Sequence, residues 1–202
     1  MKNERLLVFG GSFDPPHQGH MALLRNAAAA VRPGRVLVIP SGTAPHKRAS
    51  ATPGPLRAAM CACFRQVFPG AEVSPIEIER PGRSYTVHTL ARLQAENPGA
   101  RLYLSIGGDM LLSFAEWYHY KDILRMATLV AQSRGEEAMP RLEAAADALR
   151  KQGGQVVFAP GPVVPAASSA IRRAVAEGKD VSPLVPEEAL KIIRQNRLYT
   201  NN

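Results

Sequence analysis

A glycine-rich segment that reads GGSFDPPHQGH, beginning at Gly10, contains residue types suited to binding a phosphate group. Gly10 and Gly11 let the main chain approach an anion without an intervening side chain, and Gly19 does the same where a helix would start. A helix that begins near His17 would place the imidazoles of His17 and His20 on one face, where each can donate a hydrogen bond to an oxyanion. The segment therefore predicts a nucleotide phosphate site, and neither imidazole is expected to support the hydrophobic core.

The residues on either side of this segment predict a strand before it and a helix after it. Residues 5–9 form a short apolar run typical of a buried strand, and residues 21–31 carry apolar side chains at helical spacing. In α/β sheets, ligands bind at the carboxyl ends of strands. The glycine-rich segment lies at such an end.

The rest of the chain alternates between strand-like and helix-like patterns. Strand-like runs occur at residues 6–9, 35–39, 71–78, 101–106, 127–131 and 155–159. Residues 168–197 predict two closing helices, the first capped by Ser168 or Ser169 and the second opened by Pro186. We therefore expect an α/β fold, a doubly wound parallel sheet of Rossmann-like type with C-terminal helices, as a single domain over residues 1–202.

The segment beginning at Gly10 resembles the signature of the nucleotidyltransferase superfamily with the His-x-Gly-His motif, and within it the bacterial nicotinate-nucleotide adenylyltransferases. The resemblance extends from Leu6 to about Tyr199 in five separated motifs whose order agrees with the family. The alternative interpretation is an ordinary glycine turn with two surface histidines. The ATP contacts that the resemblance implies for this segment are Gly10, Gly11, Ser12, Phe13 and Gly19.

A basic loop follows the second predicted strand. It contains His46 and Lys47, and it resembles the Pro-Pro-His-Lys loop of the family, with Ala44 in place of the first proline. By this resemblance Lys47 takes part in catalysis and His46 binds the nicotinate nucleotide. The alternative is a flexible basic surface loop.

Two further motifs imply a site for the pyridine ring and its carboxylate. Ser84-Tyr85-Thr86 opens a predicted helix and resembles a family motif whose threonine N–H helps bind the nicotinate carboxylate, so the resemblance assigns Tyr85 and Thr86 to the nicotinate nucleotide. By the same resemblance Trp117 would stack on the pyridine ring, with the Tyr118 amide helping at the carboxylate. The alternatives are a plain helix cap by Ser84, with Tyr85 in the core, and core packing of Trp117.

Two more motifs supply the remaining ATP contacts that the resemblance implies. IGGDMLL follows the fourth predicted strand, and in it Gly107 binds ATP and Asp109 contacts the ATP ribose. AASSAIR resembles the superfamily's Ile-Ser-Ser-Thr-x-Ile-Arg element, with Ala166 and Ala167 in place of the isoleucine and the first serine. A helix start with hydroxyls and an arginine suits a triphosphate. The contacts implied there are Ser168, Ser169, Ile171 and Arg172.

The resemblance implies a reaction in which nicotinate mononucleotide attacks the α-phosphorus of MgATP, giving nicotinate adenine dinucleotide and pyrophosphate. The nucleophile is an ionised phosphate, so catalysis requires alignment and charge neutralisation rather than a protein nucleophile. Mg²⁺ would be carried by the ATP phosphates, without a protein metal site. Arg134, after the fifth predicted strand, is assigned to the nicotinate nucleotide. The residues assigned to catalysis are His17, His20, Lys47 and Arg172.

The composition favours a globular protein with an anionic ligand. Lys and Arg number 25 against 17 Asp and Glu, a net charge of +8. No apolar run approaches the roughly 20 residues of a membrane helix, and the first strand begins almost at the N-terminus, so we expect a cytoplasmic protein that does not bind membranes. Cys61 and Cys63 would face different directions on a helix, which favours buried free thiols over a disulfide or metal pair.

Two alternative functions remain open from the sequence. One is another member of the superfamily, such as a phosphopantetheine adenylyltransferase or a cytidylyltransferase. The other is a catalytically silent, basic nucleic-acid-binding relative, although the chain has no lysine or arginine block, aromatic series or zinc pattern that would favour nucleic acid. The sequence leaves homo-oligomerisation and the strictness of the preference for nicotinate undecided.

Overall fold

The computed structural model describes residues 4–43, 52–132 and 138–200. Its strands form a parallel sheet in the order β3-β2-β1-β4-β5-β6. This order confirms the expected α/β fold with a doubly wound parallel sheet. The strands are β1 (Arg5–Gly11), β2 (Arg35–Pro40), β3 (Glu72–Val73), β4 (Arg101–Gly107), β5 (Ala127–Gln132) and β6 (Gln155–Phe158).

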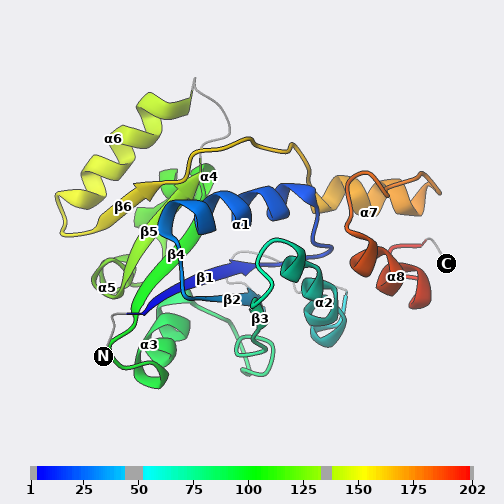
Figure 1. The fold of residues 1–202 in the computed structure, drawn as a ribbon, viewed down its shortest axis with the longest axis horizontal. Helices are drawn as coiled ribbons and strands as arrows, with labels where there is room; N and C mark the ends of the chain where they lie inside the picture. Colours follow the sequence, from blue (N-terminus) through cyan, green and yellow to red (C-terminus); the bar gives the residue numbers. More distant parts are fainter. Residues whose placement is uncertain (1–3, 44–51, 133–137, 201–202) are drawn as a thin grey trace.

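Helices cover both faces of the sheet and extend beyond its carboxyl edge. The C-terminal pair α7 and α8 lies beyond the end of β1 (Figure 1). No helix of the described segments is long and apolar enough to cross a membrane. The helices are α1 (Gln18–Val31), α2 (Gly54–Met60), η1 (Cys61–Gln66), α3 (Thr86–Glu96), α4 (Gly108–Leu112), η2 (Phe114–Glu116), α5 (Tyr120–Met126), α6 (Met139–Arg150), α7 (Ser168–Ala176) and α8 (Glu187–Gln195).

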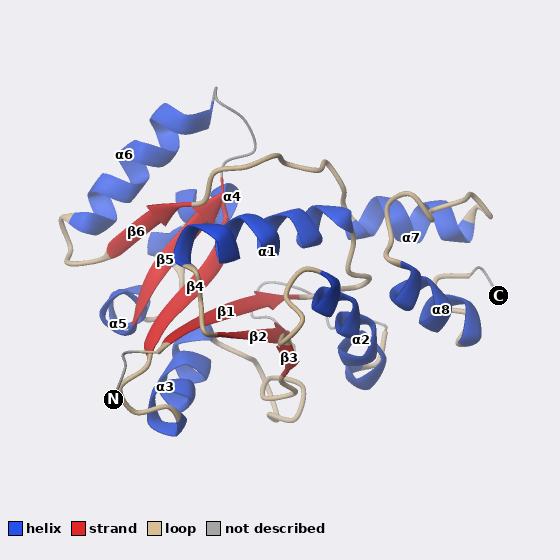
Figure 2. Ribbon diagram, viewed as in Figure 1, coloured by secondary structure: helices blue, strands red, loops and turns tan. Residues whose placement is uncertain are grey.

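The alternation of side chains along β1 divides the core into two layers. Leu6 and Val8 belong to a hydrophobic cluster with residues of α3, α4, α5 and α6, whereas Leu7 and Phe9 belong to a second cluster with residues of α1 and η1. Accordingly, α1 crosses one face of the strands while α3 and α5 lie on the other (Figure 2). Because β1 is buried on both faces, its sequence is continuously apolar.

The third strand is shorter than the sequence predicts. Residues 71–78 were expected to be extended, but β3 is only Glu72–Val73. Ser74 still donates its N–H to the Val38 carbonyl at 2.9 Å, and a turn then closes from Glu79 N to Pro75 O at 3.0 Å. Pro75 has no N–H for a sheet ladder, so the chain leaves the sheet at this residue.

The strand order reverses between β1 and β4. β1 is bonded to β2 on one side, with Gly10 opposite Ile39, and to β4 on the other, with Phe9 opposite Ser105. In doubly wound sheets the ligand crevice lies outside the carboxyl ends of the strands at this switch point. The glycine-rich segment after β1 and the loop after β4 therefore flank the expected crevice.

The two C-terminal helices form as expected, but the first is not capped by a serine side chain. The N-cap of α7 is Ala167, without a side-chain cap, and the Ser168 hydroxyl instead donates to the Pro15 carbonyl at 2.9 Å. The expected cap by Ser168 or Ser169 is therefore wrong, because Ser168 is used to bind the loop after β1. Pro186 precedes α8, as predicted.

The two cysteines are buried free thiols on η1, as the sequence indicates. Burial raises the pKa of the Cys61 thiol and raises that of Cys63 to about 12. Since the thiolate is the reactive form, neither should react with an aromatic disulfide reagent in the folded protein at mildly alkaline pH. Both should react after unfolding in guanidinium chloride. Rapid labelling of either thiol in the native protein would contradict the packing of η1.

Candidate active site

The loop between β1 and α1 is held in place by an aromatic cluster. Phe13 has a left-handed backbone (φ 46°) and a side chain only 1% exposed. Its ring lies 5.3 Å from Phe9, 5.0 Å from Phe64 and 5.1 Å from His20, measured between ring centroids. The Phe13 side chain is therefore part of the core, and only its main chain is available for the ATP contact that the resemblance implies.

His17 and His20 form a reciprocal cap at the start of α1. The N–H of His20 donates to His17 Nδ1, and the N–H of His17 donates to His20 Nδ1, both at 3.3 Å. The two rings are stacked with centroids 3.7 Å apart. An Nδ1 atom that accepts a hydrogen bond carries no proton, so this network assigns the proton of each neutral imidazole to Nε2. Each ring is thereby left with an Nε2–H donor.

Gly19 has a packing role in addition to the one predicted. A Cβ atom at this position would lie 2.8 Å from the Val164 carbonyl oxygen and 3.0 Å from His17 Nδ1. Glycine therefore allows residue 164, in the segment that leads to α7, to pass close to the helix start. Gly10, at the end of β1, is exposed, so its main chain remains open at the sheet edge.

The start of α7 contacts the same loop. Arg172 Nη1 donates to the Asp14 carbonyl at 2.7 Å, and the Ser168 hydroxyl donates to Pro15. The Ser168 hydrogen is thus engaged by the protein, whereas the Arg172 guanidinium has further N–H donors. Ile171 is 1% exposed and belongs to the C-terminal core, and Ser169 is exposed. The structure therefore brings Arg172 to the histidine loop.

The end of β4 supplies the other side of the crevice. Gly107 is the last residue of β4 and the N-cap of α4. Asp109 is exposed in the first turn of α4. Because β4 neighbours β1 in the sheet, this carboxylate lies at the same carboxyl edge as the histidine loop.

A group of aromatic residues lies at the start of α3 and after η2. The rings of Tyr85 and Tyr118 are 4.5 Å apart, and Trp117 packs against Phe114 with ring centroids 5.0 Å apart. Trp117 is half-buried and Tyr118 is 49% exposed, so both retain surface for a ligand. Thr86 is the first residue of α3, where main-chain N–H groups have no intrahelical acceptor.

The chain before α3 is anchored by Ser84 to the loop after β2 and to Glu77, a half-buried residue that follows β3. Ser84 is not a helix cap, because its hydroxyl donates to the Glu77 carbonyl at 3.3 Å and its N–H donates to Thr43 O at 2.9 Å. Thr89, on α3, donates its hydroxyl to Glu77 Oε1 at 2.8 Å. Burial raises the pKa of the Glu77 carboxyl above its usual value. A Cβ atom at Gly42 would lie 2.3 Å from the Glu77 carbonyl oxygen, so only glycine allows this approach.

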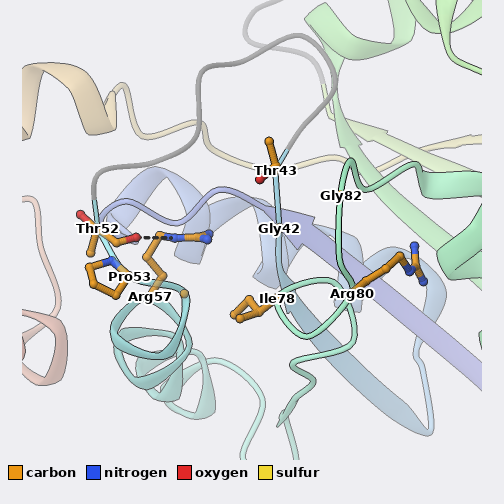
Figure 3. A pocket seen from close by; sticks show the side chains of 9 residues that line it. Gly42, Thr43, Thr52, Pro53, Arg57, Ile78, Arg80 and Gly82 are labelled. Atoms are coloured by element: carbon orange, nitrogen blue, oxygen red, sulfur yellow. Dashed lines mark hydrogen bonds between the residues drawn. The ribbon is translucent and has the colours of Figure 1, made fainter.

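A buried arginine joins three loops beside the crevice. Arg57 is 5% exposed and donates from Nη1 to Ser12 O at 2.9 Å and Ser41 O at 2.7 Å, and from Nε to Thr52 O at 3.3 Å. It lines a cavity of about 240 Å³ together with Gly42, Thr43, Ile78 and other residues (Figure 3). Carbonyls from the ends of β1 and β2 are thus fixed to one guanidinium.

Three predicted site residues, His46, Lys47 and Arg134, lie outside the described residues. Three groups that the sequence analysis did not identify take part in building the site: Asp14, Arg57 and Glu77. Asp14 lies inside the glycine-rich motif, and that position was a usable signal. Arg57 and Glu77 act through contacts with segments distant in the sequence, for which the chain shows no local pattern.

The fold and these loops define a nucleotidyltransferase of the cytidylyltransferase-like class, whose family model matches residues 8–174. A probable nicotinate-nucleotide adenylyltransferase from Gemmatimonas aurantiaca is 35% identical over 96% of this chain and 92% of its own length. One from Shouchella clausii is 33% identical over 98% of both chains. The chain belongs to the nicotinate-nucleotide adenylyltransferase family.

Solved structures share the fold at lower sequence identity. Plasmodium falciparum nicotinic acid mononucleotide adenylyltransferase complexed with NaAD matches with a TM-score of 0.77 and 15% identity, covering 97% of both chains. A putative nicotinate-nucleotide adenylyltransferase from Vibrio parahaemolyticus matches with a TM-score of 0.68 and 20% identity, covering 98% of this chain and 97% of its own. At these identities the likeness establishes the fold.

The sequence predicts no role for His17 in the hydrophobic core, but its side chain is only 5% exposed and caps α1, so it contributes to the helix start. His17→Ala should lower the free energy of unfolding by about 0.5–2 kcal/mol, the usual cost of losing a helix cap. His17→Asn keeps an N-cap side chain and should restore most of this stability. Both variants should bind MgATP more weakly than the parent, because both lack the Nε2–H donor.

Thermal melting and calorimetric titration with MgATP separate the two roles of His17. Recovery of ATP affinity together with stability in His17→Asn would show that the imidazole acts only as a cap. His20→Ala keeps the His17 side chain and provides the comparison for loss of the second donor.

Proposed function

We propose that this protein transfers AMP from MgATP to nicotinate mononucleotide, forming nicotinate adenine dinucleotide and pyrophosphate. The observation that carries the proposal is the convergence of two imidazole donors and Arg172 on one loop at the switch point of the sheet. The relatives named above carry the nicotinate-nucleotide name over nearly the full chain. They give no support to a phosphopantetheine or cytidylyl substrate, or to a nucleic-acid-binding role.

On the ATP side, the residues act by holding phosphate groups and neutralising charge. The Nε2–H groups of His17 and His20 donate to phosphate oxygens, and the helix start beside them favours negative charge. Arg172 adds a forked cation suited to two oxygens. The attacking phosphate needs no base to deprotonate it, so the rate gain comes from alignment and from stabilising charge as pyrophosphate leaves.

On the pyridine side, Trp117 presents an aromatic face and Thr86 an amide at the start of α3. Offset stacking of aromatic rings contributes about 0.5–1.5 kcal/mol beyond burial. A main-chain N–H with no helical acceptor suits a carboxylate. These two groups, with the Tyr118 amide, would orient the nicotinate ring.

Mg²⁺ enters this scheme as part of the substrate MgATP. Among the described residues no group of three or more His, Cys, Asp or Glu side chains could hold a metal ion. The donors around the histidine loop are cationic or neutral and therefore suit phosphate oxygens. Mg²⁺ commonly keeps several waters and binds through substrate phosphates, where it neutralises part of their charge.

A biosynthetic role with these substrates favours the cytoplasm as the site of action.

The protein should prefer nicotinate mononucleotide to nicotinamide mononucleotide. Main-chain N–H donors at Thr86 and Tyr118 pair with a carboxylate but would face the NH₂ group of a carboxamide. One such mismatch costs about 1–3 kcal/mol, equivalent to roughly tenfold to a hundredfold in kcat/KM. Trp117→Ala should weaken the use of both nucleotides without reversing the preference.

The experiment is incubation with MgATP and each nucleotide while pyrophosphate and the dinucleotide product are measured. Pyrophosphate release with nicotinate mononucleotide, and little with the amide, is the expected result. Equal kcat/KM values for the two nucleotides would exclude the donor arrangement. Release with neither nucleotide would exclude the proposed function.

A further inference from the structure

The last described turn of the chain reaches back to the loop after β1. The hydroxyl of Tyr199 donates to Asp14 Oδ1 at 2.6 Å, across 185 positions of sequence. Burial and the neighbouring Asp14 carboxylate raise the pKa of the Tyr199 hydroxyl. The phenol therefore stays protonated, and the hydrogen bond keeps one direction, from Tyr199 to the carboxylate.

Asp14 is the residue through which this contact reaches the candidate active site. It is 8% exposed, and its main-chain carbonyl accepts the hydrogen bond from Arg172 Nη1. Its other carboxylate oxygen, Oδ2, lies 4.0 Å from the same nitrogen. At that distance the carboxylate and the guanidinium form a loose ion pair. A rotation of the carboxylate would convert it into a close one.

The backbone around Tyr199 supports a specific role for its side chain. Tyr199 and Arg197 both have left-handed backbones, with φ of 65° and 48°. Such conformations are uncommon for residues other than glycine and persist where surrounding contacts impose them. Leu198, between them, donates its N–H to Ile193 O at 3.0 Å and packs with Tyr199 on the C-terminal core. The turn thus directs the phenol inward, to Asp14.

We propose that Tyr199 is a positioning residue for ATP binding. By holding Asp14 Oδ1, it keeps the carboxylate from closing onto Arg172, and so leaves the guanidinium available to the triphosphate. Without the hydroxyl, the carboxylate would form a close pair with Arg172 and compete with phosphate for the same N–H groups. This inference rests on the proposed function for the identity of the ligand.

The test compares Tyr199→Phe with Tyr120→Phe as a matched control. Tyr120→Phe removes the hydrogen bond from the Tyr120 hydroxyl to Gln152 Oε1 at 2.7 Å, which lies on the surface between α5 and the turn before β6. Calorimetry measures the affinity for each of two ligands separately. One is α,β-methylene-ATP with Mg²⁺, an analogue that cannot transfer AMP, and the other is nicotinate mononucleotide.

Tyr199→Phe should weaken binding of the ATP analogue by about tenfold, with nicotinate mononucleotide affinity unchanged. Tyr120→Phe should change neither affinity. If Tyr199 had a purely structural role, Tyr199→Phe would lower Tm and would weaken the binding of both ligands, and that result would overturn the proposal. Unchanged affinity for the analogue in Tyr199→Phe would overturn it as well.

A double variant tests whether the carboxylate is the competitor. An asparagine side chain carries no charge, so in Tyr199→Phe combined with Asp14→Asn the closer ion pair cannot form, and affinity for the ATP analogue should recover most of the loss. Failure to recover would contradict the mechanism. Because the analogue is bound without turnover, these results stand apart from pyrophosphate release by the parent protein, which tests the proposed function.

Discussion

The imidazoles of His17 and His20 each accept a hydrogen bond from the other residue's main-chain N–H, and the rings stack at the start of α1. This arrangement gives the His17 N–H an acceptor at the helix start and gives the His20 N–H a second acceptor beside the His17 carbonyl, which lies 2.8 Å away. It also fixes the orientation of both rings before any ligand arrives. The same contacts therefore build the helix and prepare two donors for phosphate, so little reorganisation is needed on binding.

The loop that carries these histidines is fixed from several directions. Arg57 binds the Ser12 carbonyl, and α7 binds Asp14 and Pro15 through Arg172 and Ser168. These hydrogen bonds are accepted by main-chain carbonyls, so they do not depend on the side chains of the loop. Each contact comes from a different part of the chain. The site is therefore assembled only when β2, α2 and the C-terminal helices have all packed around β1.

Local patterns were sufficient to predict the framework of the fold. The apolar run of β1 is continuous because that strand is buried on both faces of the sheet. The apolar residues of α1 recur at helical spacing because only one face of that helix is buried. The error at β3 arose because the alternation of Ile76, Glu77 and Ile78 fits a strand pattern, although Pro75 ends the ladder. The error at Ser168 arose because a serine at a helix start can bond either to its own helix or to a neighbouring loop.

The candidate site was predictable only in part, because some of its contacts join segments that no local sequence pattern connects. His17, His20 and Arg172 belong to motifs that can be seen within a few residues. The contacts made by Arg57 and Tyr199 join segments that are remote in sequence, and no spacing rule connects them. The dual role of His17 was also hidden, because whether a histidine caps a helix depends on its side-chain rotamer rather than on its position.

The central claim is that the His17–His20 pair presents two Nε2–H donors to phosphate. Long-range ¹H–¹⁵N correlation spectra of the free protein, with resonances assigned through His17→Asn and His20→Ala, report the protonated nitrogen of each ring directly. We predict that each imidazole, in its neutral form, carries its proton on Nε2, with Nδ1 unprotonated. A proton on Nδ1 of either ring would contradict the reciprocal cap and the donor arrangement derived from it.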